Sequence, residues 1–259
     1  MIAYFITVRT GSSRLPNKSI KKIRGKATIE YLIDNIRKSK KTSNIILCTT
    51  TEKRDDVLCD IARDNGIKYF RGSTEDKLQR WLDACNEFSV DFFVNVDGDD
   101  LLFDVALGDI CISQKQGSTV DFINGRGLYN DVYGVSKNAL EIAVSNKSTN
   151  DTEFVKTFFD NISSDIEIGT VKNIPEKYSK KDVRMTLDYE EDFAFFKTIF
   201  ESLLDSNLSV DFNNAMSLIE SKPEIKNINW HRESNWSENQ KKMINKNPAK
   251  YLNNELDYI

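Results

Sequence analysis

The strongest constraint on the fold is a regular alternation of strand and helix patterns along the first half of the chain. The continuous apolar run Ile2–Val8 opens the chain as a buried strand. Further strand patterns end at Thr49, Phe70 and Val96, and helical patterns lie between them. Because strands joined by crossover helices run parallel, the alternation predicts an α/β fold with a mainly parallel sheet and helices on both faces.

The second half of the chain is less regular. Glu190–Leu204 is a strongly amphipathic helix whose aromatic side chains we assign to the core, whereas the segment from Trp230 onward is polar and poorly patterned. We find no repeat or flexible linker, and we expect a single domain over 1–259 with 226–259 as a C-terminal tail. We expect strands at 2–8, 44–49, 67–70, 91–96, 122–123, 132–135 and 165–171, and helices at 29–36, 55–65, 74–88, 104–116, 137–145, 151–159, 190–204 and 210–221.

The loops that follow the first four strands share one kind of composition. The segments after Val8, Thr49, Phe70 and Val96 are all rich in Arg, Ser, Thr or Asp. In open α/β sheets, ligands bind beyond the carboxyl ends of the strands. We therefore expect these four loops to form one site.

The loop after the first strand combines fixed cations with small residues. Arg9, Arg14 and Lys18 surround the small residues Gly11–Ser13. Backbone N–H groups of such a loop can point at anionic oxygens and Arg supplies planar donors, so the loop suits a polyphosphate. It lacks both the G-x-x-x-x-G-K-[ST] and the G-x-G-x-x-G spacing, which disfavours a P-loop or a dinucleotide fold. A solvated basic turn is the alternative.

Acidic residues gather at two other places. Asp97, Asp99 and Asp100 surround Gly98 at the end of the fourth strand. Mg²⁺ prefers one or two carboxylates together with phosphate oxygens and water, so this loop is a candidate magnesium site. Asp188 follows a short apolar stretch just before a helix and is a second candidate ligand. Judged singly, the first group could be an Asx turn and Asp188 a helix N-cap.

Composition narrows the partners and the compartment. The formal net charge of −4 indicates no general affinity for nucleic acid. Met1 leads straight into the first strand and no apolar run approaches membrane-spanning length, so we expect a cytoplasmic protein without signal peptide or membrane contact. Cys48, Cys59, Cys85 and Cys111 have no C-x-x-C spacing, and we expect buried free thiols and no zinc site.

The order of the motifs along the chain carries a family resemblance. The segment Val8–Lys18 is similar to the opening of the cytidylyltransferases that activate acidic sugars, the synthetases of CMP-linked keto-deoxyoctulosonate and CMP-linked nonulosonic acids. The similarity is strongest to the spore-coat polysaccharide branch and covers roughly residues 1–225. The other matching segments are Gly25-Lys26, Cys48-Thr49-Thr50, Arg71-Gly72-Ser73-Thr74-Glu75-Asp76, Gly98-Asp99 and Thr186-Leu187-Asp188-Tyr189-Glu190-Glu191-Asp192.

The resemblance implies a fold and a set of site residues. The fold would be the Rossmann-like nucleotide-diphosphosugar transferase fold of the GT-A type, a three-layer sandwich around a mostly parallel sheet. Within the site, Arg71 and Ser73 would lie near the cytidine, and Asp99 and Asp188 would carry Mg²⁺. The implied catalytic residues are Lys18, Arg14, Asp99 and Asp188, and the implied nucleotide-binding residues are Arg9, Gly11, Ser12, Ser13, Arg14, Lys18, Arg71, Ser73 and Asp97.

Two positions depart from the family pattern. Leu101 stands where family members usually carry proline, and Asp97 stands where sugar-acid synthetases carry a glutamine that faces the acceptor. In the family both positions lie on the acceptor side of the site, so these departures affect the assignment of the acceptor more than the assignment of the nucleotide. Keto-deoxy acids, nonulosonic acids and small phosphonates or phosphates all stay open as acceptors.

The expected activity is transfer of CMP from CTP to an acidic acceptor with release of pyrophosphate, for surface polysaccharide or glycoconjugate precursors. Residues 120–175 match the region that forms a dimer arm in relatives, so we expect a homodimer. The only histidine, His231, lies far in sequence from the four loops, and we expect a surface or packing residue there. A GT-A glycosyltransferase with a nucleotide-sugar donor and a non-catalytic nucleotide-binding protein are the alternatives.

Overall fold

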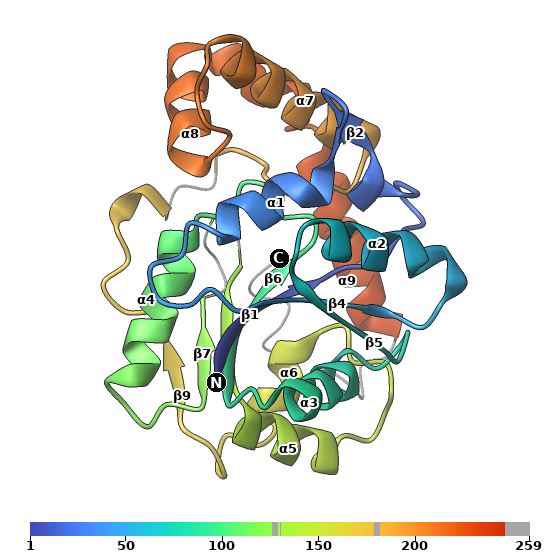
Figure 1. Cartoon of the computed structure of the whole chain (residues 1–259), viewed down its shortest axis with the longest axis vertical. Helices are drawn as coiled ribbons and strands as arrows, with labels where there is room; N and C mark the ends of the chain where they lie inside the picture. The colour runs from blue at the N-terminus through green and yellow to red at the C-terminus, as the bar shows by residue number, and fades with distance from the viewer. Residues whose placement is uncertain (126–128, 130, 179–181, 247–259) are drawn as a thin grey trace.

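The protein is built around one seven-stranded sheet (Figure 1). A computed structural model describes residues 1–125, 129, 131–178 and 182–246. The strand order is β5-β4-β1-β6-β8-β7-β9, and β8 is the strand that runs antiparallel to its neighbours. The strands are β1 (Ile2–Thr7), β4 (Ile45–Thr50), β5 (Lys68–Gly72), β6 (Phe92–Asp97), β7 (Phe122–Asn124), β8 (Tyr133–Ser136) and β9 (Ile168–Thr170), and a separate hairpin pairs β2 (Lys22–Ile23) with β3 (Lys26–Ala27).

Helices cover both faces of the sheet, with α1 and α2 on one side of the central strands and α3 and α5 on the other (Figure 1). The first face carries α1 (Thr28–Ile36), α2 (Asp56–Asp64), α4 (Val105–Gln116), α7 (Glu190–Asp205) and α8 (Phe212–Ser221). The second face carries α3 (Lys77–Phe88), α5 (Lys137–Asn146) and α6 (Val155–Asp160). The remaining elements are α9 (Arg232–Lys246) and the 3₁₀ turns Lys18–Ile20, Lys53–Asp55, Glu176–Tyr178 and Pro223–Ile228.

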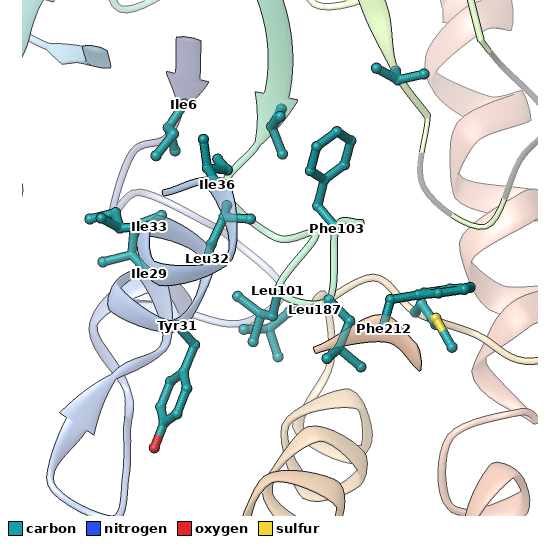
Figure 2. Packing of buried hydrophobic residues seen from close by; sticks show 14 of the residues in the cluster. Ile6, Ile29, Tyr31, Leu32, Ile33, Ile36, Leu101, Phe103, Leu187 and Phe212 are labelled. Atoms are coloured by element: carbon teal, nitrogen blue, oxygen red, sulfur yellow. The ribbon is translucent and has the colours of Figure 1, made fainter. Parts of the chain in front are cut away.

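The alternation of side chains along β1 separates two hydrophobic cores. Tyr4 and Ile6 point into the core under α1, whereas Phe5 points into the core under α3. Successive strand residues face opposite sides of a sheet, so a continuous apolar strand is what a sheet covered on both faces requires. Figure 2 shows the first core, to which Leu32 and Ile36 of α1 and Leu101 all contribute side chains.

Leu101, the residue that replaces the family proline, has no exposed surface. Its side chain belongs to the first core together with Leu187 (Figure 2), and its carbonyl accepts a hydrogen bond of 3.2 Å from the Asn35 side-chain amide. The Leu101 side chain therefore contributes packing, and the expectation that it lies on the acceptor side is wrong.

Most expected elements are present, and the fold class is confirmed. All four cysteines are free and buried, as expected. Helix α6 begins only at Val155, so the expected helix 151–159 starts too early. The C-terminal tail holds the helix α9, which the polar and poorly patterned sequence did not predict. Among the described residues, no helix is both long and apolar enough to cross a membrane.

The segment 120–175 supplies β7, β8 and β9, which complete the same sheet as the N-terminal strands. The strand expected at 165–171 is confirmed as β9, which lies at one edge of the sheet. A dimer arm in this segment stays a prediction.

Candidate functional site

The loop between β1 and the first 3₁₀ turn is held at its start by one buried carboxylate. Asp55, which is 1% exposed, accepts hydrogen bonds from the backbone N–H of Thr10 at 2.8 Å and from its hydroxyl at 2.6 Å. The hydroxyl of Thr50, at the end of β4, donates to the other oxygen of Asp55. Burial would raise the pKa of Asp55, but these hydrogen bonds outweigh it and lower the pKa.

The loop ends in a left-handed turn at Asn17 (φ 60°), whose N–H donates to the Thr10 carbonyl at 3.1 Å. Asparagine tolerates this conformation better than most residues. Because both ends of the loop meet at Thr10, the side chains of Arg9, Arg14 and Lys18 are presented from one compact turn.

The end of β6 approaches the end of β1 closely. The N–H of Gly98 donates to the Thr7 carbonyl at 2.9 Å. A Cβ atom at Gly98 would lie 2.7 Å from the Cβ of Val8, which is too close for any side chain. Glycine at this position therefore lets the acidic loop come directly beside the cationic loop.

Lys18 joins the two predicted metal carboxylates. Its Nζ lies 2.7 Å from Asp99 Oδ2 and 2.9 Å from Asp188 Oδ1, and Arg14 Nη2 lies 2.7 Å from the same Asp188 oxygen. The N–H of Leu187 donates to the Asp99 carbonyl at 3.1 Å, which joins the two acidic segments through the backbone. Asp99 and Asp188, which lie 81 and 170 positions after Lys18 in the sequence, thus converge on one ammonium group.

The two carboxylates have opposite pKa shifts. Burial would raise the pKa of Asp188, but the charges of Lys18 and Arg14 outweigh it and lower the pKa. Burial raises the pKa of Asp99, and the negative charges of Asp188 and Asp97 add to that effect, although Lys18 opposes it. Of the two carboxylates, Asp99 is therefore the easier one to protonate.

The donor chemistry of this centre fits Mg²⁺. Two carboxylates facing one cation are the hard oxygen ligands that Mg²⁺ takes from a protein when phosphate oxygens and water supply the rest. Over the described residues, no group of three or more His, Cys, Asp or Glu side chains is placed to hold a metal alone. A divalent ion here would be shared by Asp99, Asp188 and a bound phosphate.

A second ion pair lies at the same edge of the sheet. Lys77 Nζ lies 2.8 Å from Asp97 Oδ1, and the Asn95 amide donates to the same oxygen at 3.2 Å. Burial would raise the pKa of Asp97, but the charge of Lys77 outweighs it and lowers the pKa. Nearby, the buried Arg80 donates to the Ser73 carbonyl at 2.8 Å, while its Nε has no hydrogen-bond partner within the described chain.

These groups surround one cavity of about 860 Å³. That volume lies within the usual range for small-molecule sites. Of the expected site residues, the structure brings to the cavity Arg9, Gly11, Ser12, Ser13, Arg14, Lys18, Asp97, Asp99 and Asp188.

Arg71 and Ser73 are not among the residues that line the cavity. The Arg71 guanidinium donates to the carbonyls of Thr50 at 3.0 Å and Glu52 at 2.9 Å, and it forms an ion pair of 2.6 Å with Asp56. These contacts tie the ends of β4 and β5 to the start of α2. His231 also lies outside the cavity, with a side chain that is 58% exposed.

Sequence reasoning missed several residues of the cavity wall. The basic pair Lys77 and Arg80 could have been found, because positions i and i+3 at a helix start face the same way. Residues of β8, α6 and α9 gave no such signal, because their place at the cavity depends on the tertiary fold. The missed lining residues are Glu75, Lys77, Arg80, Asp131, Tyr133, Asp151, Glu153, Phe154, Lys156, Trp236, Asn239 and Gln240, among others.

The fold and the site together consist of a mostly parallel α/β sheet with a cationic loop and two carboxylates at its carboxyl edge. The sequence model of the cytidylyltransferase family matches residues 3–115. This match and the relatives below confirm the resemblance to cytidylyltransferases, and specifically to their spore-coat polysaccharide branch.

Two relatives match most of the chain. The spore coat polysaccharide biosynthesis protein SpsF of Bacillus subtilis is 25% identical over 209 residues, which are 77% of this chain and 86% of SpsF. The uncharacterized protein MJ1063 of Methanocaldococcus jannaschii is 29% identical over 229 residues, which are 86% of this chain and 92% of MJ1063.

Solved structures show the same fold. A cytidylyltransferase from Leptospira borgpetersenii superposes with a TM-score of 0.77 at 24% identity, covering 87% of this chain and 96% of that protein. A CMP:2-keto-3-deoxy-manno-octonic acid synthetase in complex with CTP superposes with a TM-score of 0.60 at 12% identity, covering 78% of this chain and 98% of that protein.

Proposed function

We propose that this protein is a Mg²⁺-dependent cytidylyltransferase that transfers CMP from CTP to an acidic acceptor and releases pyrophosphate. The acceptor classes are a sugar acid, a phosphonate or a phosphate, and the product would serve surface polysaccharide or glycoconjugate synthesis. The single observation that carries the proposal is the convergence of Lys18, Asp99 and Asp188 in the cavity that Arg9 and Arg14 also line. The match to the cytidylyltransferase family supports CTP as the donor.

Each group at the centre has a role in this reaction. Arg9, Arg14 and the backbone of Gly11–Ser13 would hold the triphosphate oxygens, since Arg offers planar paired donors and glycine allows close approach. The nucleoside would extend toward the start of α3, where Lys77 and Arg80 line the cavity. Bound Mg²⁺ would neutralise phosphate charge between Asp99 and Asp188.

The bond changes are those of an in-line substitution at phosphorus. An acceptor oxygen forms a bond to the α-phosphorus, the bond from that phosphorus to the bridging oxygen breaks, and pyrophosphate leaves with the electron pair. Positioning and charge neutralisation dominate such reactions. Lys18 offsets the charge that develops on the departing pyrophosphate, a contribution of about 2–4 kcal/mol by comparison with other electrostatic contacts.

The acceptor decides whether a base is needed. A phosphate or phosphonate oxygen is already ionised and attacks without one, whereas a sugar hydroxyl must lose its proton. Asp97 lines the cavity, but its lowered pKa makes it a weak base near neutral pH. Because Asp97 is also paired with Lys77 at 2.8 Å, an acceptor that presents an ionised oxygen would suit this site without a further base.

The test is pyrophosphate release from each of the four nucleoside triphosphates with pooled acidic acceptors and magnesium chloride. CTP should be preferred, and Asp99→Asn should lower the rate at least about a hundredfold. His231→Ala is the control and should leave the rate unchanged, because His231 lies outside the cavity. Full pyrophosphate release by Asp99→Asn would show that the assignment of this carboxylate is wrong.

The two alternatives predict different results, and adding a nucleotide sugar to the assay distinguishes them. A glycosyltransferase would release a nucleoside diphosphate from a nucleotide sugar and no pyrophosphate from CTP. A non-catalytic nucleotide-binding protein would bind CTP without turnover across the acceptor pool.

A further inference from the structure

The segment that leads into α7 carries apolar side chains on one side and two charged side chains on the other. Val183, Met185 and Leu187 belong to the first core. Arg184 and Asp188 alternate with them in the sequence, and Arg184 Nη2 lies 3.8 Å from Asp188 Oδ2. Burial of the apolar residues thus leaves Arg184 and Asp188 together on the other side of the segment.

The guanidinium of Arg184 is held by a buried carboxylate. Its Nε and Nη2 donate to the two oxygens of Asp192 at 2.9 and 3.1 Å, and its Nη1 donates to Glu233 of α9 at 2.9 Å. The side chains of Arg184 and Asp192 are 1% and 0% exposed. The guanidinium also lies 5.6 and 5.8 Å from the ring centres of Tyr189 and Trp236. A planar group held at all three of its nitrogens has little freedom to turn.

Asp192 also holds the backbone that carries Asp188. Its Oδ2 accepts the N–H groups of Asp188 and Tyr189, both at 2.9 Å. Such a carboxylate in the first turn of a helix satisfies N–H groups that the turn leaves without partners. The Asn229 amide donates to its Oδ1 at 2.9 Å. One buried carboxylate therefore fixes both the main chain of Asp188 and the guanidinium beside its side chain.

The two oxygens of Asp188 have different partners. Oδ1 lies 2.7 Å from Arg14 Nη2 and 2.9 Å from Lys18 Nζ, two residues that line the cavity. Oδ2 instead faces Arg184 Nη2 at 3.8 Å. Because Asp192 fixes Arg184, the attraction between Arg184 and Oδ2 resists rotation of the Asp188 carboxylate. Oδ1 therefore stays directed at the centre.

Stability alone is a weak explanation for this arrangement. Removing two charges from water is costly, and well-packed apolar residues often stabilise a protein as much as a buried ion pair does. What the charges add is a fixed direction for the carboxylate. We infer that Arg184 is a positioning residue that acts through Asp188 and holds its carboxylate in the orientation that receives a divalent cation. This inference rests on the proposed function.

The experiment measures the binding of Mn²⁺, as a probe for Mg²⁺, to the nucleotide-free protein by electron paramagnetic resonance. Arg184→Lys keeps the positive charge, but its ammonium cannot replace the planar fork that joins Asp192 to Asp188. Partners of metal ligands typically change metal affinity tenfold to a hundredfold, so the Kd of Mn²⁺ should rise at least about tenfold. The rate of pyrophosphate release at limiting magnesium should fall in step, and excess magnesium chloride should recover most of it.

Glu233→Gln is the matched control. It removes an ion pair from the same guanidinium but leaves the contacts with Asp192 and Asp188 in place, so the Kd of Mn²⁺ should stay within about twofold of the wild type. Asp192→Asn is a second variant in case Arg184→Lys folds poorly. It keeps Arg184 but loosens its guanidinium, and it should raise the Kd of Mn²⁺ about tenfold.

The affinity for CTP without metal separates positioning from a general structural role. Calorimetry in EDTA should give a Kd of CTP within about threefold of the wild type in all three variants, because Arg9, Arg14 and Lys18 are unchanged. Such a constant Kd, together with weakened Mn²⁺ binding, is expected only when the defect is confined to the carboxylate.

Each outcome decides the inference. An unchanged Kd of Mn²⁺ in Arg184→Lys and Asp192→Asn would overturn it, as would a wild type without saturable Mn²⁺ binding. Equal weakening in Glu233→Gln, or a parallel loss of metal-free CTP affinity, would also overturn it, because Arg184 would then support the fold in general. Mn²⁺ binding that depends on Arg184, without pyrophosphate release from any nucleoside triphosphate, would uphold the positioning role while the proposed function fails.

Discussion

Replacing Lys18 by glutamine removes the one ammonium that lies between Asp99 and Asp188. Both carboxylates are shielded from solvent, with side-chain exposures of 24% and 3%. Their oxygens lie 2.7 and 2.9 Å from the same Lys18 Nζ, and two charges held that close together repel each other by about 3 kcal/mol at an effective dielectric constant of about 20. Removing one partner of a buried ion pair generally lowers the free energy of unfolding by about 3–5 kcal/mol. For a domain of this size the melting temperature of Lys18→Gln should fall by about 6–20 °C.

The same variant tests the magnesium assignment without an activity measurement. Once Lys18 is gone, Asp188 keeps Arg14 and Arg184 as partners but Asp99 loses its ammonium, and a divalent cation can take the place of that ammonium between the two carboxylates. Magnesium at about ten times its Kd adds about 1.4 kcal/mol of stability, which corresponds to about 3–6 °C. We expect this rise in Lys18→Gln and a smaller one in the wild type, measured by differential scanning fluorimetry with calcium-free magnesium chloride.

A matched lysine variant controls for the loss of one surface charge. Lys21→Gln removes an ion pair with Glu190, whose side chain is 67% exposed, and such a pair contributes little. Its melting temperature should stay close to that of the wild type. Equal stability of Lys18→Gln and Lys21→Gln, or an equal response of both to magnesium, would refute the reasoning about the carboxylate pair.

Two further predictions concern residues that hold the site in place. The pKa of Asp55 is lower in the folded protein than in the unfolded chain, so the ionised carboxylate stabilises the fold above the ordinary carboxyl pKa. This stabilisation is lost as the pH falls through the folded-state pKa. The difference in melting temperature between the wild type and Asp55→Asn should therefore shrink below about pH 4. Asp192→Asn should lower the free energy of unfolding by about 1.5–3 kcal/mol in urea titrations, because the buried Arg184 guanidinium would lose the carboxylate 2.9 Å away and keep Glu233 and Asp188 as its charged partners; a difference below about 0.5 kcal/mol would contradict this.

The strand and helix pattern of the first half was predictable because local periodicity reports burial directly. The run Ile2–Val8 is apolar at every position except the buried Thr7, as a strand covered on both faces requires, and Gly66 adopts the left-handed φ that ends α2. Helix α6 and the tail were harder to predict. In α9, the polar face is anchored by Glu233 and Arg232, so its stability comes from ion pairs to distant segments and not from an apolar stripe.

The functional site likewise contains some residues whose position the sequence could predict and others whose position it could not. The position of Arg9, Arg14 and Lys18 at a strand end could be foreseen, because parallel strands present their carboxyl ends at one edge of the sheet. The buried pair of Lys77 with Asp97 could not, because the residue types are ordinary and only their distance of 2.8 Å makes them a pair.

By itself, the sequence determined the fold class, the cationic loop and the candidate carboxylates, because each of these depends on neighbours close along the chain. The tertiary structure alone decided that Asp99 and Asp188 share the ammonium of Lys18 and that Arg71 contacts α2 instead of the cavity. It also decided that α9 closes one side of the cavity. The physical reason is that electrostatic and packing interactions depend on distance in space, and residues 170 positions apart can lie 2.9 Å apart only after the chain has folded.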